Sequence, residues 1–491
     1  MNLTAVVLVI VAAILIGAFG LRLSRTTSDF YVASRSVSPL WNASAIGGEY
    51  LSGASFLGIA GLILTHGADM LWLPVGWTGG YLVLLVLVSA PLRRSGAYTL
   101  PDFAEARLES MSVRRSASVL VVLIGWLYLM PQFQSAGLVL RTITGAPVWV
   151  GGLVVALVVA VNVLSGGMRS ITFVQAFQYW LKLTALAVPV FFLLAAWQGG
   201  GAPAELDPAW AQPLTGDDEY GLYSTYSLIL ATFLGTMGLP HVLVRFYTNP
   251  DGRAARRTTL MVLGLLGAFY LLPSVYGWLG RLYTPGLDRP DTVVLTLPGE
   301  MIGGTLGDLL TALVTAGAFA AFLSTSSGLT VSVAGVIAQD LLKGGVREFR
   351  IATLMAVSVP LALALWARAL AIADVVGLAF AVAASSFCPL LVLGIWWRRL
   401  TSTGALAGLF AGGGLASAAV LAQILGGPYG GLLGALVSQP AAWTVPIAFL
   451  VMVLVSLATP GRVPKGVATI MVRLHTPENL RLDRGDWRPR G

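Results

Sequence analysis

The distribution of hydrophobic positions along the 491-residue chain predicts a bundle of membrane-spanning helices. A helix needs about 20 mostly apolar residues to cross the roughly 30 Å hydrocarbon core of a bilayer, where its backbone must satisfy its own hydrogen bonds. Suitable stretches are residues 3–21, 42–64, 69–90, 117–141, 147–164, 172–197, 222–243, 258–280, 305–339, 350–367, 369–396, 403–425 and 441–459. The predicted fold class is therefore an all-α polytopic membrane protein with about 13 transmembrane helices.

The polar residues that interrupt these stretches fall mainly in three places. Gly47, Gly48, Gly53 and Gly58 interrupt the second stretch, and Gly235, Gly238 and Pro240 interrupt the seventh. Glycines weaken a helix and allow positive φ, and proline removes a backbone donor, so both segments are predicted to open and expose carbonyls and amides. A small-residue packing face for the first segment, and a simple kink for the second, are the alternatives.

The third place is a run of hydroxyls at Ser324, Thr325, Ser326 and Ser327 inside the stretch 305–339. A helical Ser or Thr often bonds back to a carbonyl one turn earlier, which is sufficient to explain a single hydroxyl. Four in a row favour a function. The hydroxyls of Ser324 and Thr325, with the carbonyl of Ala321, are hard oxygen donors of the kind that Na⁺ prefers.

The interruptions also suggest an internal repeat. With the first helix set aside, the next ten divide into 42–197 and 222–396, and each half opens with an interrupted helix. Broken helices at corresponding positions in two halves are typical of the binding sites of secondary transporters.

Composition supports a membrane protein and excludes several classes of protein. Hydrophobic residues make up 56% of the chain and charged residues 11%, against about 25% charged residues in ordinary soluble domains. The single Cys excludes a disulfide scaffold, and the three His lack the spacing of a zinc site. A Walker loop is also absent from the sequence, so we predict neither an enzyme nor an ATP-driven pump, and no cofactor.

The net charge of +8 has a topological explanation. Most Lys and Arg residues fall in alternate loops, whereas the intervening loops hold only Arg141, Arg281, Arg289 and Arg368. Basic loops remain cytoplasmic. The rule predicts a multi-pass protein of the cell membrane with its N-terminus outside and its C-terminus in the cytoplasm, and the charge requires no nucleic-acid partner. For Lys182, inside a helix, packing is the preferred interpretation and a role as the partner of an anion is the alternative, whereas Arg245 is interpreted as an interfacial anchor.

Three segments resemble the sodium:solute symporter family, and two of these resemble its acetate and monocarboxylate branch in particular. They read DFYVASR over 29–35, GEYLSGASFLGI over 48–59 and GLPHVLVRFYT over 238–248, the last two carrying the resemblance to that branch. The resemblance extends over most of residues 25–400. It implies a five-plus-five inverted-repeat core like that of the amino-acid transporter LeuT, with Na⁺-coupled alternating access.

The resemblance also implies a sodium site. Its ligands are the backbone carbonyls of Gly48, Leu51 and Ala321 and the side chains of Ser324 and Thr325. Half-helix amides and nearby polar side chains suit a small carboxylate. The candidate substrate-binding residues are Ser52, Ala54, Ser55, Gln132, Thr236 and Gly238.

The predicted layout assigns every part of the chain. It has an N-terminal extra helix over 1–24, inverted repeats over 25–197 and 222–400 around an acidic extracellular loop at 198–221, two extra helices over 401–460, and a basic cytoplasmic tail over 461–491. The predicted function is import of a small monocarboxylate such as acetate with Na⁺, without an obligate protein partner. H⁺ coupling, proline or another small organic solute as substrate, and a membrane sensor with a transporter fold remain alternatives.

Overall fold

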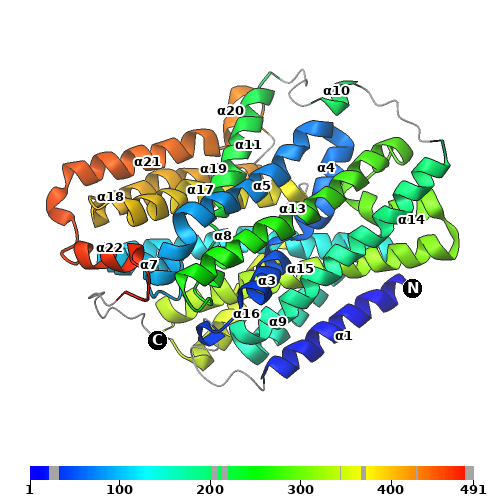
Figure 1. Cartoon of the computed structure of the whole chain (residues 1–491). Coiled ribbons are helices and arrows are strands. Elements are labelled where there is room, and N and C mark those ends of the chain that lie inside the picture. The colour runs from blue at the N-terminus through cyan, green and yellow to red at the C-terminus, as the bar shows by residue number, and fades with distance from the viewer. Residues whose placement is uncertain are drawn as a thin grey trace.

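The computed structural model describes residues 1–21, 33–201, 208–212, 219–342, 344–366, 372–426 and 429–480. Within these ranges the chain forms helices and turns without any strand (Figure 1), which confirms the predicted all-α class. Residues 29–32 of the first family-like segment lie outside the described ranges. So do much of the acidic loop 198–221, the junction at 367–371 and residues 481–491 of the basic tail.

The first half of the chain contains two long helices preceded by a series of short ones. The elements are α1 (Asn2–Leu21), η1 (Ala33–Arg35), α3 (Pro39–Tyr50), η2 (Ala54–Gly58), α4 (Ile59–His66), η3 (Gly67–Leu71), α5 (Trp72–Val83), η4 (Leu84–Val88), α6 (Ser89–Arg94), α7 (Leu100–Leu108), α8 (Met111–Thr144) and α9 (Val148–Gly199).

The second half begins with another interrupted helix. Its elements are α10 (Pro208–Ala211), α11 (Gly221–Thr236), α12 (Pro240–Phe246), α13 (Gly252–Tyr283), η5 (Pro290–Thr292), α14 (Val293–Ile302), α15 (Gly304–Asp340), α16 (Val346–Trp366), α17 (Ile372–Trp396), α18 (Ser402–Gly408), η6 (Leu409–Gly414), α19 (Leu415–Gly426), α20 (Gly431–Ser438), α21 (Ala441–Ala458), η7 (Pro460–Arg462) and α22 (Val467–His475).

The described residues contain 11 helical stretches long and apolar enough to cross a membrane, plus a shorter apolar helix at Asn2–Ala18. The predicted count of about 13 is therefore not reproduced. The difference from the prediction lies at the N-terminal end, because the first helix is short and the predicted spans 42–64 and 69–90 merge into the 41-residue stretch Ala54–Arg94. At 1.5 Å per residue that stretch is about 60 Å long, twice the hydrocarbon core. Gly67, at φ 73°, interrupts it between α4 and α5.

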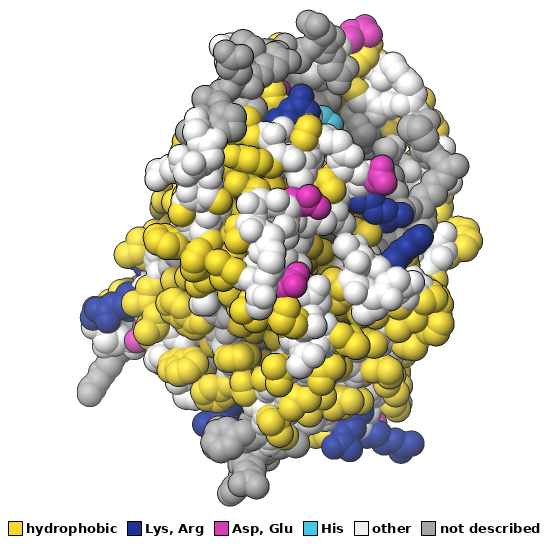
Figure 2. Space-filling model, turned by 90° about the vertical axis from the view of Figure 1, so that its right-hand side faces the viewer, with side chains coloured by type: hydrophobic (Ala, Val, Ile, Leu, Met, Phe, Trp, Pro, Cys, Tyr) yellow, Lys and Arg dark blue, Asp and Glu magenta, His cyan; other side chains and the backbone are white. Residues whose placement is uncertain are grey.

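The outer surface of the bundle is apolar, as a lipid-facing surface must be. Val119, Phe191 and Leu271, on three different long helices, are 67%, 71% and 69% exposed. Figure 2 shows hydrophobic side chains covering much of one face, with Lys and Arg along its lower edge and charged residues of both signs further up. Such large exposed apolar area is not expected on a water-soluble monomer. It indicates burial in a bilayer.

The helix α7, which precedes α8, is fixed to the bundle by caps and ion pairs. Thr99 accepts a hydrogen bond from the backbone N–H of Asp102 and so caps α7, and the Asp102 carboxylate accepts from the N–H of Thr99 in return. Arg114 at the start of α8 lies 2.8 Å from Asp102, 2.6 Å from Glu105 and 2.6 Å from Asp340. These contacts join α7, α8 and the end of α15.

Both predicted helix interruptions are present. The first lies between Tyr50, where α3 ends, and Ala54, where the chain becomes helical again. The second lies between Thr236 and Pro240. Because α3 packs against α9 and α15 and α11 packs against α5 and α17, both breaks lie inside the bundle.

The glycines of the first break act differently from the prediction. None of Gly47, Gly48, Gly53 and Gly58 has a positive φ. Instead, a Cβ at Gly48 would lie 2.1 Å from the carbonyl oxygen of Gln175, and one at Gly47 would lie 2.7 Å from the ring of Tyr179. These two glycines therefore allow α3 to pack closely on α9, which is the small-residue packing alternative.

Substitution of Gly48 tests this close packing. In Gly48→Ala the new methyl group collides with backbone, which cannot rotate away, so we expect destabilisation by about 1–3 kcal/mol or more. The measurement is the unfolding temperature of the purified protein in detergent. Gly264→Ala in α13 is the control, because a Cβ there meets nothing within 4 Å. It should be neutral or stabilise by about 0.5–1 kcal/mol; equal destabilisation of both variants would contradict the packing role.

Candidate functional site

The first break leaves backbone carbonyls without helical partners in the middle of the bundle. The last carbonyls of any helix have no intrahelical N–H to accept from, and they carry the negative end of the helix dipole. Here the carbonyls of Gly48 and Leu51 are in that position, and both residues are buried. The broken helix thus presents oxygen atoms to whatever lies opposite.

Lys182 of α9 lies opposite these oxygens. Its Nζ donates to the carbonyl of Gly48 at 2.5 Å, to the carbonyl of Leu51 at 2.7 Å and to Oγ of Ser324 at 3.0 Å. The residue is 0% exposed. The interpretation of Lys182 as a packing residue was wrong, because its charged end contacts the broken helix and does not reach the interface.

The hydroxyl run of α15 contacts the same region. Ser324 donates to the carbonyl of Ala321 at 3.0 Å, and Thr325 donates to the carbonyl of Glu49 at 2.6 Å. The five residues predicted as sodium ligands therefore lie near one another, around Lys182. Ser324 also makes the local backbone bond that was the alternative explanation for a single hydroxyl.

A buried ion pair connects the two broken helices. Arg245 of α12 donates through Nε to Glu49 of α3 at 2.7 Å, and both side chains are 1% exposed. Its other nitrogens donate to Thr172 at 2.8 Å and to Gln175. Arg245 is therefore no interfacial anchor, in contrast to its first interpretation. Gly328 makes room for this pair, since a Cβ there would lie 2.1 Å from Oε1 of Glu49.

One face of α9 supplies the polar partners that the sequence analysis did not identify. Thr172, Gln175, Tyr179 and Lys182 are spaced by three and four residues, which places them on one side of a helix. All four are buried, and three of them bond to groups at the first break or to Arg245. In the sequence, this face is visible as polar residues at intervals of three and four positions within an otherwise apolar span.

The candidate substrate-binding residues are all buried close to the two breaks. Ser55 lies 3.1 Å from the hydroxyl of Tyr270, Gln132 accepts from the N–H of Gly53 at 3.0 Å, and Thr236 lies 2.7 Å from the hydroxyl of Tyr50. Ser52 lies in the first break and Ala54 directly after it, while Gly238 lies in the second. A Cβ at Gly238 would lie 2.4 Å from the carbonyl oxygen of Ala383, so this glycine packs against α17.

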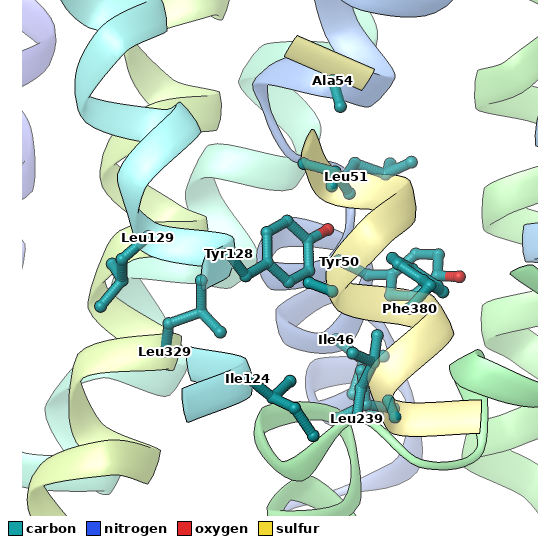
Figure 3. Close-up of a cluster of buried hydrophobic side chains, with 14 of the residues drawn as sticks. Ile46, Tyr50, Leu51, Ala54, Ile124, Tyr128, Leu129, Leu239, Leu329 and Phe380 are labelled. Carbon is teal, nitrogen blue, oxygen red and sulfur yellow. The ribbon is translucent and has the colours of Figure 1, made fainter. Parts of the chain in front are cut away.

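An aromatic cluster surrounds these residues. Phe380 of α17 has its ring centroid 6.2 Å from that of Tyr50, 5.7 Å from that of Trp77 and 6.0 Å from that of Tyr128. Figure 3 shows Tyr50, Tyr128 and Phe380 near Leu51 at the first break. The sequence analysis missed these rings, because an aromatic residue in an apolar span gives no signal that separates a pocket from packing.

Several polar atoms of this cluster have no hydrogen-bond partner among the described residues. They are Nε1 of Trp77, the hydroxyl of Tyr81 and both ring nitrogens of His241. Tyr81 packs edge-on to Tyr50 at 4.9 Å, and His241 packs edge-on to Tyr128 at 5.3 Å. Buried polar groups are rarely left unsatisfied, so these atoms are candidates to bind a solute.

Two broken helices, an internal ion pair and unsatisfied donors at the centre of an apolar bundle define a class of protein. Ionisable residues inside a membrane mark ion or solute pathways, and secondary transporters build their sites from broken helices. The fold agrees. A solved Na⁺-coupled sialic acid symporter, in a substrate-bound outward-open state, matches with a TM-score of 0.73 at 15% identity, over 94% of this chain and 97% of that one.

Sequence comparison defines the family. The model of the sodium:solute symporter family matches residues 30–412, so the chain belongs to that family. An uncharacterized symporter of Bacillus subtilis (strain 168), YwcA, is 31% identical over 483 residues, covering 92% of this chain and 93% of that protein. A monocarboxylic acid transporter of Corynebacterium glutamicum is 33% identical over 441 residues, covering 80% of this chain and 78% of that protein.

The ion pair between the broken helices can be tested by a double-mutant cycle. Glu49→Gln leaves the guanidinium of Arg245 buried without a charged partner, which we expect to destabilise the protein by about 3–5 kcal/mol. Removing both charges, in Glu49→Gln with Arg245→Met, should cost less than Glu49→Gln alone. The measurement is thermal unfolding of each purified variant. Additive effects of the two single substitutions would show that the two charges do not interact.

Proposed function

We propose that this protein is a cation-coupled symporter that imports a small monocarboxylate such as acetate by alternating access. The observation that carries the proposal is the pair of broken helices, joined by the Glu49–Arg245 ion pair and lined by unsatisfied donors. Alternating access requires two halves that rearrange around a central site, and broken helices are typical of such sites. The ion pair joins the two halves of the chain, because Glu49 lies just before the break in the first half and Arg245 lies just after the break in the second half.

The chemistry of the cluster supports a small carboxylate as the substrate. A carboxylate accepts hydrogen bonds only, and Nε1 of Trp77, the hydroxyl of Tyr81 and a ring nitrogen of His241 are all able to donate. The rings of Tyr128 and Phe380 offer apolar contact to a short hydrocarbon tail. The relative from Corynebacterium glutamicum, a monocarboxylic acid transporter, points to the same substrate class.

The coupling cation implied by the family is Na⁺, with H⁺ as the alternative. Separately from the identity of the coupling ion, we propose that the oxygens of Gly48, Leu51, Ala321, Ser324 and Thr325, between α3 and α15, form a site for a small cation, either a metal ion or a protonated amine. The distribution of basic loops supports an orientation in the cell membrane with the N-terminus outside and the C-terminus in the cytoplasm. The partners of the protein are then the lipid bilayer, the cation and the organic anion.

Transport into proteoliposomes tests this function. We expect radiolabelled acetate to accumulate when a cation gradient is imposed, with Na⁺ and H⁺ gradients applied in separate arms, and not when both gradients are absent. Unlabelled propionate and pyruvate should compete, because they carry a carboxylate on a short uncharged chain, whereas proline should not, because its ammonium group would need a partner of its own. Competition by proline alone would place the substrate among amino acids. A folded protein that accumulates nothing under any gradient would contradict a transport function and favour a sensor.

The donor of Trp77 is tested by a substitution that retains the ring. Trp77→Phe removes Nε1–H, and loss of a hydrogen bond to a charged group costs about 1.5–3 kcal/mol, so the KM for acetate should rise about 10-fold or more. Trp126→Phe is the matched control, because Nε1 of Trp126 is also unpaired but its side chain lines a groove with Val119 and Val122, away from the breaks. An unchanged KM in Trp77→Phe would remove this residue from the substrate site.

A further inference from the structure

A side chain already occupies the cation site proposed between α3 and α15. Three of its oxygens, from Gly48, Leu51 and Ser324, accept hydrogen bonds from Nζ of Lys182 at 2.5, 2.7 and 3.0 Å. A lysine ammonium has three N–H donors and no acceptor. Donors and acceptors are therefore matched one to one, and a metal ion at bonding distance from the same three oxygens would overlap Nζ.

The two remaining oxygens of the proposed site are also engaged. The carbonyl of Ala321 accepts from Ser324, and the hydroxyl of Thr325 donates to the carbonyl of Glu49. A hydroxyl that donates in this way still has lone pairs, but the carbonyl of Glu49 in α3 fixes the orientation of the hydroxyl group. In this conformation the whole donor set is satisfied without Na⁺.

The position of the ammonium follows from the charges around it. Glu49 forms its ion pair with Arg245 at 2.7 Å, and none of the salt bridges among the described residues includes Lys182. The ammonium is met instead by the carbonyls at the C-terminal end of α3, where the helix dipole is negative, and by a hydroxyl of α15. These are the interactions that a bound Na⁺ would make. The ammonium thus bridges the broken helix and α15 from its attachment on α9.

We propose that the ammonium of Lys182 is a tethered cation that takes the place of Na⁺ at this site, so that transport by this protein requires no Na⁺ there. This inference rests on the proposed symport function and assigns the cation of its site. It predicts that any Na⁺ dependence of the wild-type protein arises at other oxygens. It also predicts that removing the ammonium opens a site for a small cation.

The decisive variant is Lys182→Ala, with acetate uptake measured at a fixed membrane potential. In Na⁺-free medium, with an organic cation at equal ionic strength, uptake should fall at least about 10-fold, because three charge-assisted hydrogen bonds across the break are lost together. Na⁺ should restore it, whereas the large organic cation should not. Tyr179→Phe is the control, since Tyr179 lies one turn away on α9 and its hydroxyl donates to Leu265, outside the site. That variant should acquire no Na⁺ requirement.

A second variant tests the inference with the lysine in place. If Na⁺ does not bind these oxygens in the wild-type protein, Ser324→Ala will leave the half-saturating Na⁺ concentration of uptake unchanged, whatever its effect on the rate. A rise in that concentration would overturn the inference, because it would place Na⁺ at the hydroxyl. Equal uptake by Lys182→Ala and wild type without Na⁺, or no restoration by Na⁺, would overturn it as well.

Thermal unfolding separates failure of this inference from failure of the proposed function. Na⁺, compared with the organic cation, should raise the unfolding temperature of Lys182→Ala, and of Lys182→Ser if the first variant does not fold, because a ligand that binds only the folded state stabilises it. Ser324→Ala should unfold with the same response to Na⁺ as wild type. These readouts need no substrate. If no protein accumulates acetate but Na⁺ stabilises only the lysine variants, the transport assignment fails and the tethered cation stands.

Discussion

The organisation of this bundle depends on one constraint, which is that backbone carbonyls exposed by a broken helix must be met by hydrogen-bond donors where no water is available. An apolar bilayer leaves a transmembrane segment no solvent to satisfy its polar groups. When α3 ends at Tyr50 in the middle of the bundle, its last carbonyls need donors, and Lys182 supplies them. The contact holds α3, α9 and α15 together at one point, and the other features of the centre are arranged around it.

The second set of buried charges connects this point to the other half of the fold. Glu49 follows Gly48 in the chain, so the residue next to a carbonyl that accepts from Lys182 carries the carboxylate that pairs with Arg245 of α12. Breaking a buried pair costs far more than breaking an exposed one, because the remaining charge stays desolvated. Any rearrangement that separates the two broken helices must therefore give these charges new partners.

Close packing explains why small residues line this centre. Glycine at 48 lets the backbone of α3 approach α9, and glycine at 328 leaves space for the carboxylate of Glu49. Without this approach the ammonium of Lys182 would not reach both carbonyls, since a lysine stem has a fixed length. The same glycines were predicted to open the helix through positive φ, and that reason was wrong. The helix is interrupted at Leu51 and Ser52. Its last carbonyls accept hydrogen bonds from Lys182 of α9 instead of from backbone N–H groups of the same helix.

The sequence by itself determined the class of the protein, the regions of its two broken helices and the oxygens that gather between them. Apolar length, basic loops and glycine or proline inside a span are local properties, so they are readable from the chain. Five predicted ligands from α3 and α15 do lie together, and the family follows from three short segments and is confirmed over residues 30–412. Only the tertiary structure decided which side chain meets those oxygens and which rings surround the breaks. Lys182 lies 131 residues from Leu51, and Arg245 lies 196 from Glu49. A lone charge in an apolar helix looks the same in sequence whether it packs, reaches the interface or neutralises a partner. The difference depends on which buried groups are brought near it, and that is set by packing between helices distant in the chain.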